Sequence, residues 1–497
     1  MRDWVRLSEG DHVVSALRDF NASEVLILEN GSSLTLIEDV PKSHKILVKP
    51  VAEGGDVLKF GYSIGKAKAD LLPGSWVHIH NLRTGLGGIL DYRYEPQLTE
   101  AGPEPAGSKT FQGYLRPGGE VGIRNEIWII NTVGCINKTC EILAKRGSER
   151  TAGKADGVYH FAHPFGCSQL GDDLTQTAKL LSSLVHHPNA AGVLVVGLGC
   201  ENNQIDSFRE AIGDIDGKRI RFMRSQDEED ELEKGLLLIE ELADYAATFK
   251  REPVSVSRLR IGLKCGGSDG LSGITANPLV GTIADRITSL GGTAILTEVP
   301  EMFGAETILM NRAENEQIFG QIVSLVNNFK EYFLRHNQEI YENPSPGNKA
   351  GGISTLEEKS LGCTQKGGHA TVNDVILYGN RVRKSGLNLL EAPGNDLVSV
   401  TALSAAGAHM VLFTTGRGTP FGGPVPTVKI SSNSELAERK RNWIDYNAGQ
   451  LLEGKTMTQL TDELWEQLIA LASGQTRTLN ENNGFKEIAI FKDGVIL

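Results

Sequence analysis

Short apolar runs separated by turn residues fill the N-terminal part of the chain. The runs EVLIL, SLTLI, KILVKP and VLKFGY alternate with the polar segments ENGSS, DVPKSH and AEGGD. Runs of this length that are rich in Val, Ile and Leu and bounded by Gly, Pro, Asn or Asp are typical of β-strands. Residues 1–94 are therefore predicted to form a small β-rich module.

The pattern changes after residue 112, where apolar runs alternate with amphipathic stretches. EIWIINTVGC, AAGVLVVGLGC and LRIGLKCGG have the pattern of buried strands, and each passes into a turn that holds Gly and Cys. LTQTAKLLSSLVHHP, DEEDELEKGLLLIEELADYAATF and the segments near 278–290 and 313–335 are predicted helices. Strands that alternate with helices in this way predict largely parallel sheets.

Two polar segments divide the chain. EPQLTEAGPEPAGSKT, at 95–110, is rich in Pro, Gly and Glu and is typical of a linker, and KREPVSVSR, at 250–258, indicates a second boundary. We therefore predict an α/β fold in which a β-rich module (1–94), a linker (95–112), a first α/β domain (113–252) and a second α/β domain (253–497) follow one another. A chain of 497 residues is long enough for several domains.

Composition narrows the range of partners. The formal net charge is −12, which argues against nucleic-acid binding and against attraction to anionic membranes. The N-terminal residues MRDWVRLSEGDHVV lack the apolar core of a secretory leader, and no apolar run approaches the roughly 20 residues that span a bilayer. We expect a cytoplasmic protein, in which the six cysteines are free thiols or metal ligands rather than disulfides.

Four segments place a cysteine beside glycines and close to a carboxylate, amide or hydroxyl. They are HPFGCSQLGDD, VGLGCENNQ, LKCGGSDGLSG and SLGCTQKGG, with Cys167, Cys200, Cys265 and Cys363. Thiolates in glycine-rich turns can bind iron or a similar metal, and ligands gather at the carboxyl ends of parallel strands. The alternative is that each cysteine is a small buried hydrophobe. The spacings match no Cys-x-x-Cys zinc or ferredoxin pattern.

Other side chains have the chemistry of acid–base catalysis or anion binding. His78 and His80 alternate along the predicted strand GSWVHIHNLRT, so both are expected on one face, while His44 and Lys45 lie in a turn. Structural roles for these residues remain open at this point. Arg124 and Asn125 in GEVGIRNEIW, and Arg417 in TTGRGTPFGG, are candidate oxyanion binders. The acidic pair Glu298 and Glu301 follows another predicted strand.

Taken together, these motifs resemble the altronate/galactarate dehydratase family. The resemblance is carried by VHIHN, SHKI, RNEIWI, TVGC, GCSQLGDD, HPNAAGVLVVGLGCENNQ, CGGSDGLSGITANP, LTEVPEMFGAE, YENPSPGNKAGGISTLEEKSLGCTQK, APGND and VLFTTGRGTPFGGPVPTVKI, which cover nearly the whole chain. The N-terminal module is similar to a SAF domain, a small β-clip-like unit. The segments NLRTGLGGILDY, CINKTCEIL and KGGHATVND depart from the family pattern and leave the sugar acid open.

The resemblance implies a hydro-lyase that removes water from a sugar acid with the help of a divalent metal. The family's metal is chiefly Fe²⁺; Mn²⁺ and an iron–sulfur cluster are alternatives. The expected reaction converts D-altronate to 2-dehydro-3-deoxy-D-gluconate in hexuronate catabolism. Galactarate dehydration, a sulfolactate sulfo-lyase-like reaction, and a sugar-acid-binding protein without catalysis are the alternatives. We expect a homo-oligomer with no nucleic-acid or membrane partner.

Three sets of residues are hypotheses for this chemistry. The metal ligands are expected among Cys167, Cys200, Glu201, Cys265, Glu298 and Cys363. The catalytic or substrate-orienting groups are expected among His44, His78, His80, Lys45 and Asp172, which is also an alternative oxygen ligand. The substrate's carboxylate and hydroxyls are expected to meet Arg124, Asn125, Lys366 and Arg417.

Overall fold

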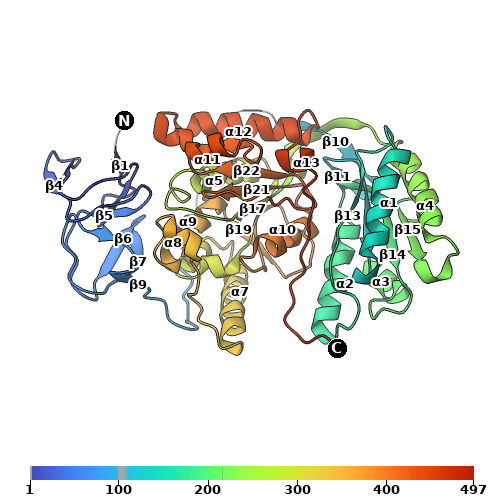
Figure 1. Ribbon diagram of the computed structural model, residues 1–497, viewed down its shortest axis with the longest axis horizontal. Coiled ribbons are helices and arrows are strands. Elements are labelled where there is room, and N and C mark those ends of the chain that lie inside the picture. The colour runs from blue at the N-terminus through green and yellow to red at the C-terminus, as the bar shows by residue number, and fades with distance from the viewer. Residues whose placement is uncertain (1–2, 99–106, 108, 215) are drawn as a thin grey trace.

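The computed structural model describes residues 3–98, 107, 109–214 and 216–497. Part of the expected linker, residues 99–106 and 108, lies outside the described residues. The chain forms three regions side by side, and their order in space differs from their order in sequence (Figure 1). The C-terminal region lies in the middle, between the N-terminal strands and the first α/β region. It can therefore contact both of the others.

The N-terminal module consists of short strands in three small sheets. Their orders are β1-β2-β5-β8, β3-β4 and β6-β7-β9, and every pairing is antiparallel. The strands are β1 Trp4–Val5, β2 Val13–Ala16, β3 Val25–Ile27, β4 Ser33–Thr35, β5 Lys45–Leu47, β6 Asp56–Lys59, β7 Tyr62–Ala67, β8 Trp76–Val77 and β9 Leu82–Arg83. The turn-rich sequence predicted such a module, and the prediction is confirmed.

The first α/β region is built on a four-stranded parallel sheet with the order β13-β12-β14-β15. Its strands are β12 Glu126–Asn131, β13 Val158–His160, β14 Ala190–Gly197 and β15 Ile220–Arg224, and its helices are α1 Asn137–Arg150, α2 Gly171–Val185, α3 Ile205–Ile212 and α4 Glu231–Ala246. A small antiparallel sheet of β11 Val121–Gly122, β10 Thr110–Leu115 and β16 Arg251–Ser255 joins the two ends of this region.

The C-terminal region contains a seven-stranded parallel sheet with the order β19-β20-β18-β17-β21-β22-β23. Its strands are β17 Arg260–Cys265, β18 Thr293–Leu296, β19 Val372–Ile376, β20 Gly386–Leu390, β21 Met410–Thr415, β22 Thr427–Ser431 and β23 Tyr446–Asn447. The α-helices are α5 Ala276–Ser289, α6 Glu306–Met310, α7 Glu316–Arg335, α8 Pro346–Ala350, α9 Leu356–Thr364, α10 Asp396–Ala405, α11 Ser434–Arg439, α12 Met457–Ala472 and α13 Leu479–Asn482. Both parallel sheets confirm the predicted α/β fold.

Short 3₁₀ helices connect several of these elements. They are η1 Pro117–Gly119, η2 Gly134–Ile136, η3 Ser225–Asp227, η4 Val256–Arg258, η5 Val299–Met302, η6 Gln365–Gly367 and η7 Ala448–Glu453. Among the helices of the described ranges, none is long and apolar enough to cross a membrane.

Strand periodicity explains how the two α/β regions join. On β12, Ile127 and Ile129 pack against α1 and α4, whereas Trp128 and Ile130 point to the other face of the sheet. That other face is covered by α2, which also packs against α10 of the C-terminal region. A continuous apolar core therefore runs from one sheet to the other.

The segment that leaves the N-terminal module runs along the C-terminal region. Tyr92 donates a hydrogen bond to Glu306, and the hydroxyl of Tyr94 donates to the carbonyl of Ala313 at 2.7 Å. The backbone amide of Gln97 donates to the carbonyl of Asn311 at 2.7 Å. These contacts tie the module to the C-terminal region before the chain continues to the first α/β region.

Candidate active site

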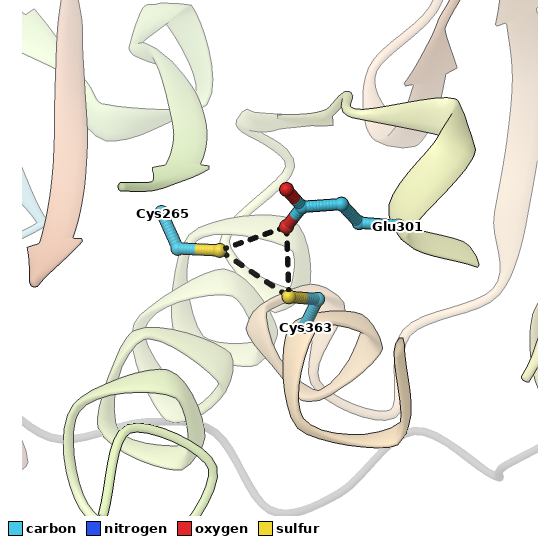
Figure 2. Close-up of side chains that lie close together, drawn as sticks. All are labelled: Cys265, Glu301 and Cys363. Carbon is cyan, nitrogen blue, oxygen red and sulfur yellow. Dashed lines mark hydrogen bonds between the residues drawn. The ribbon is translucent and has the colours of Figure 1, made fainter. Parts of the chain in front are cut away.

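Two cysteines and a glutamate from three separate elements meet in the C-terminal region (Figure 2). Cys265 is the last residue of β17, Glu301 lies in η5 after β18, and Cys363 lies near the end of α9. The two Sγ atoms are 3.3 Å apart. Both donate to Glu301 Oε2, Cys265 at 3.4 Å and Cys363 at 3.1 Å. All three side chains are buried.

Buried lysines surround this cluster. Lys359 Nζ donates to Glu301 Oε1 at 2.9 Å. Next to it, Glu298 binds Lys264, accepts a bond from Lys366 Nζ at 2.8 Å, and accepts one from the backbone amide of Cys265 at 3.0 Å. Glu298 adopts a left-handed backbone conformation with φ of 70°, which is uncommon for a residue other than Gly and is typical of functional sites. The lysines thus fix both carboxylates in place.

The electrostatics keep Glu301 charged and Cys363 protonated. Burial raises the pKa of Glu301, but Lys359, Lys264 and Lys366 outweigh it and hold the pKa well below its usual range. The hydrogen bond with Cys265, together with burial, raises the pKa of Cys363 well above its usual range. A metal that binds such a thiol must displace its proton.

An open cavity lies directly beside the cluster. Its volume is about 760 Å³, and its lining includes Cys265, Glu301, Lys359, Asn343, Asn348 and Asp396. The side chain of Asp396 is 29% exposed and lies 3.0 Å from Lys264 Nζ. Ligand sites of this kind combine an apolar wall with a few convergent polar groups, and here the aromatic rings of Phe329 and Phe333 form part of the wall.

The donor set of the cluster fits a divalent transition metal. Among the described residues, Cys265, Glu301 and Cys363 are the group of three potential ligands whose donor atoms all lie within 4.8 Å of one another. Two sulfurs and one carboxylate oxygen suit a borderline cation such as Fe²⁺ or Zn²⁺ better than Mg²⁺ or Ca²⁺. Three protein ligands with a cavity beside them leave room for substrate, as in catalytic metal sites.

The N-terminal module docks against the helix that carries Cys363. Glu358, in the first turn of α9, accepts bonds from Lys45 Nζ at 2.8 Å and Lys59 Nζ at 2.9 Å. All three side chains are nearly inaccessible to solvent. Burial raises the pKa of Glu358, but the two lysines outweigh it and lower the pKa to about 2. Burial lowers the pKa of Lys45 to about 8. Through its ion pair with Glu358, Lys45 helps to hold the N-terminal module against α9.

The expected histidine group forms around Trp76 at the same contact. Trp76 Nε1 donates to His44 Nδ1 at 3.1 Å, and its ring stacks on His78 with centroids 5.3 Å apart. His78 Nδ1 lies 3.0 Å from Ser354 Oγ, and His44 Nε2 lies 3.4 Å from the carbonyl of Ala350. Burial lowers the pKa of His44 to about 4 and that of His78 to about 3. Both imidazoles are neutral near pH 7.

The prediction that His78 and His80 share a strand face is wrong. The strand β8 ends at Val77, and a turn follows it because Asn81 Oδ1 accepts a bond from the amide of His78 while Asn81 Nδ2 donates to the carbonyl of Trp76. His78 is buried, whereas His80 is exposed and lies against the Trp76 ring with centroids 5.1 Å apart. Only the buried imidazole reaches the C-terminal region.

The structure does not bring the four cysteines that are candidate metal ligands together. Cys167 and Cys200 are exposed and lie in the first α/β region, outside the group that Cys265 and Cys363 form. Glu201 accepts bonds from the amides of Leu198 and Gly199 in its own turn and from Thr132 Oγ1, after β12, at 2.6 Å. Asp172 is exposed in the first turn of α2, where a carboxylate favours the helix dipole.

Of the four expected substrate binders, Lys366 is the one whose side chain bonds a carboxylate beside the cluster. Arg124 is buried and paired with Glu481, with Nε 2.7 Å from Oε1. Asn125 accepts a bond from Arg116 and donates to the carbonyl of Ala246. These two residues therefore hold the interior together and do not line the cavity. Arg417 is exposed in the turn after β21, where its backbone amide donates to the carbonyl of Gly267.

Several residues of the site had no clear signal in the sequence. Lys264 lies inside an apolar strand, where a lysine is rare, and that position was the available clue. Lys359 and Glu358 are neighbours on a short helix with no amphipathic pattern, because all nine of its residues are buried. The sequence predicts Glu298 as the ligand, whereas the structure places Glu301, the other half of the acidic pair, beside the two thiols. The spacing of apolar residues in the sequence does not reveal that α9 is buried on every face.

Three family models match consecutive parts of the chain. They are described as the altronate/galactarate dehydratase SAF domain at 2–85, the second domain of D-galactarate dehydratase/altronate hydrolase at 113–247, and the C-terminal domain of D-galactarate/altronate dehydratase at 256–496. The first match confirms that the N-terminal module is a SAF domain. The three matches follow the three regions of the fold.

Curated proteins match over essentially the full length. The chain is 51% identical to altronate dehydratase of Escherichia coli (strain K12), over 99% of this chain and 100% of the relative. It is 50% identical to altronate dehydratase of Bacillus subtilis (strain 168), over 100% of both. It is 30% identical to galactarate dehydratase (L-threo-forming) of Escherichia coli (strain K12), over 98% of this chain and 96% of the relative. The chain therefore belongs to the altronate/galactarate dehydratase family.

Proposed function

We propose that this chain is a hydro-lyase that converts D-altronate to 2-dehydro-3-deoxy-D-gluconate and water with the help of a divalent metal, chiefly Fe²⁺. The observation that carries the proposal is the buried Cys265–Glu301–Cys363 cluster at the edge of an open cavity. Identity of 50–51% over the full length to two altronate dehydratases supports the substrate. The 30% identity to a galactarate dehydratase makes galactarate a weaker candidate.

The reaction has two demands that the site must meet. A proton leaves C2 of the sugar acid and hydroxide leaves C3, so negative charge develops on the carboxylate side of the substrate. Preorganised positive charge is needed there, because the C2 proton is otherwise too weakly acidic. A divalent cation held by Cys265, Glu301 and Cys363 supplies this Lewis-acid stabilisation when it is bound.

Lys359 acts as a positioning residue. Its ammonium donates to Glu301 Oε1 at 2.9 Å, Asn343 Oδ1 at 3.0 Å and Asn348 Oδ1 at 3.2 Å. The three bonds use all the donors of a lysine and hold Glu301 so that its other oxygen faces the two sulfurs. Glu301 thus stays oriented without a metal, which reduces the reorganisation that binding requires.

Asp396 is the residue to which we assign removal of the C2 proton. Its carboxylate lines the cavity and is partly exposed, so substrate can reach it. Lys264, at 3.0 Å, holds it in place. A general base must lie within hydrogen-bond reach of the proton it removes, and a carboxylate on the cavity wall can meet this requirement when substrate binds. The neutral, buried imidazoles of His44 and His78 lie instead against residues 350 and 354, at the contact with the module.

The experiment that tests the proposal is an anaerobic assay of the Fe²⁺-loaded chain on a panel of sugar acids. We expect a 2-keto-3-deoxy acid from D-altronate and a much lower rate with galactarate and sulfolactate. Asp396→Asn should lower kcat by about 10²-fold or more, with a smaller change in KM, because general acid–base catalysis contributes about that much. Turnover of galactarate in preference to altronate, or release of sulfite alone, would contradict the substrate assignment.

A further inference from the structure

Three exposed cysteines lie at one edge of the sheet in the first α/β region. Cys135 is in η2, directly after β12; Cys167 is in the loop after β13; and Cys200 is in the turn after β14. The sheet order β13-β12-β14 makes these three parallel strands neighbours. Their carboxyl ends therefore meet at one edge, where ligand sites form in α/β sheets.

Hydrogen bonds link the three loops around the cysteines. The amide of Gly134 donates to the carbonyl of Phe165 at 2.8 Å, so the Cys135 turn contacts the Cys167 loop. The amide of Asn203 donates to the carbonyl of Gly166 at 2.9 Å. The amide of Ser168 donates to Asn202 Oδ1 at 2.8 Å, so the Cys167 loop also contacts the Cys200 turn. Each cysteine thus lies within a few residues of a direct contact with another loop.

The exposure of these thiols is unusual. Free cysteine is among the most often buried residue types, and the other three cysteines of the chain, Cys140, Cys265 and Cys363, are buried. Exposed thiols are readily oxidised. Three exposed thiols on adjacent loops therefore indicate a function that requires them. Glycines make the close approach of the loops possible. At Gly166 a Cβ would lie 1.9 Å from the carbonyl oxygen of Thr132, so a side chain is excluded.

We propose that Cys135, Cys167 and Cys200 bind an iron–sulfur cluster of the [4Fe–4S] type, separate from the metal site of the dehydration reaction. A single tetrahedral ion with metal–sulfur bonds of about 2.3 Å needs its sulfurs roughly 4 Å apart. In the described part of the chain these three thiols do not form a group with donor atoms within 4.8 Å, unlike Cys265, Glu301 and Cys363. A four-iron cluster spans sulfurs that are farther apart, and three cysteines leave one iron facing solvent.

The surroundings suit an anionic cluster. Gln226 Nε2 lies 3.6 Å from Cys200 Sγ and can donate to it. Two of the nearby carboxylates are already bound, since Glu201 is held by its own turn and Asp173 accepts bonds from the amides of Asp493 and Gly494. Amide and backbone donors near cluster sulfurs stabilise the negative charge of Fe–S centres. The edge therefore offers thiolates without a competing hard-oxygen site.

The test is spectroscopic and does not depend on turnover. The full chain is purified anaerobically, incubated with equal amounts of Fe²⁺ and Fe³⁺ and with sulfide, desalted, and analysed for iron, for acid-labile sulfide and by Mössbauer spectroscopy. We expect about four irons and four sulfides per chain in a brown product with the spectrum of a cubane cluster. Each of Cys135→Ser, Cys167→Ser and Cys200→Ser should lower cluster content at least several-fold, because each removes one thiolate.

The matched control is Cys265→Ser/Cys363→Ser, which changes two buried thiols at the dehydration site and should keep the cluster. Circular dichroism of the three serine variants should match the unmodified chain, since the replaced thiols are exposed. A cluster retained in those variants and lost in the control would overturn the proposal. Stoichiometric zinc in place of the cluster, or no iron–sulfide retained after desalting, would also overturn it. Neither result bears on altronate turnover.

Discussion

Two strand edges in this protein share a sequence signature but differ in chemistry. At the edge of the C-terminal sheet, Cys265 meets Cys363 in a buried site rich in lysine and glutamate. At the edge of the first α/β sheet, Cys135, Cys167 and Cys200 are exposed. At each edge, an apolar strand leads into a turn that contains Gly and Cys. The difference arises from what each edge packs against, because the SAF domain packs against α9, the helix that carries Cys363.

Charge distinguishes the two edges more than the thiols do. Lys264, Lys359 and Lys366 bring fixed positive charge to within hydrogen-bond distance of Glu298 and Glu301. Such charge, held in a site of low dielectric, stabilises developing negative charge far better than the same groups in water. At the edge of the first α/β sheet, the group beside a thiol is instead the neutral amide of Gln226. We therefore assign dehydration to the C-terminal edge.

The largest expected effect is on turnover and separates the two edges directly. Cys265→Ser or Glu301→Gln removes a proposed ligand beside the cavity, so kcat/KM for D-altronate with Fe²⁺ should fall by about 10³-fold, equal to several kcal/mol of lost charge stabilisation. Cys167→Ser serves as the control at the other edge and should stay within a few-fold of the unmodified chain. Equal losses in both variants would contradict the separation.

The next largest effect is on stability at the contact between the SAF domain and α9. Glu358→Gln leaves Lys45 and Lys59 buried without their shared carboxylate. Breaking a buried ion pair by removing one partner costs about 3–5 kcal/mol. Urea unfolding should show a loss of that size, and the SAF domain should become more accessible to protease. A loss below about 1 kcal/mol would mean that the lysines find other partners.

The same carboxylate predicts a pH dependence. The pKa of Glu358 is lowered from 4.5 to about 2, so its contribution to stability is complete above pH 4.5 and is lost as the pH falls toward 2. The free energy of unfolding of the unmodified chain should decline over that window. Glu358→Gln, which has no group to titrate there, should decline less over the same window, as thermal melts at several pH values would show.

A smaller effect is expected at the other edge. Glu201 accepts three hydrogen bonds, two from Leu198 and Gly199 in its own turn and one from Thr132 after β12. Glu201→Gln retains the shape but loses the charge, so the free energy of unfolding should fall by about 1–2 kcal/mol, in the range of hydrogen bonds to charged groups. Turnover of D-altronate should stay within a few-fold. A loss of activity without a loss of stability would instead indicate a direct role for Glu201.

The smallest effect is expected for Asp172→Asn. Asp172 is exposed in the first turn of α2, so its replacement removes only a favourable contact with the helix dipole. The free energy of unfolding should change by about 0.5 kcal/mol or less, and turnover should not change. A marked loss of activity would restore the catalytic role that the sequence suggested for this residue.

Apolar runs and periodicity predicted the strands and helices well. The alternation in EIWIIN sends Ile127 and Ile129 to one core and Trp128 to another, as a parallel strand buried on both faces requires. The helix predicted near 313–335 begins at Glu316, because the side chain of Asn315 caps it. The error in the predicted strand bounds arose where a side chain closes a turn. Asn81 closes a turn on His78, which ends β8 at Val77, before either histidine.

The site was harder to predict, because its partners are distant in sequence. The motif Gly-Cys identified Cys265 and Cys363, but nothing in it separates these from Cys167 and Cys200, which are on another domain. Arg124 resembled a carboxylate binder, yet it pairs with Glu481, 357 residues away. A guanidinium binds a protein carboxylate and a substrate carboxylate with the same geometry, so local sequence cannot tell the two apart. The packing of the domains determines which carboxylate the guanidinium binds.

The most direct test of the account is an anaerobic Co²⁺ titration of the Cys135→Ser/Cys167→Ser/Cys200→Ser variant, whose remaining cysteines include the two of the proposed active site. The account predicts one tightly bound Co²⁺ per chain, with thiolate-to-cobalt charge-transfer absorption and with d–d bands that change when D-altronate is added. Loss of these bands on further replacement of Cys265 and Cys363 by Ser would complete the assignment. Absence of thiolate-bound cobalt in the first variant would contradict it.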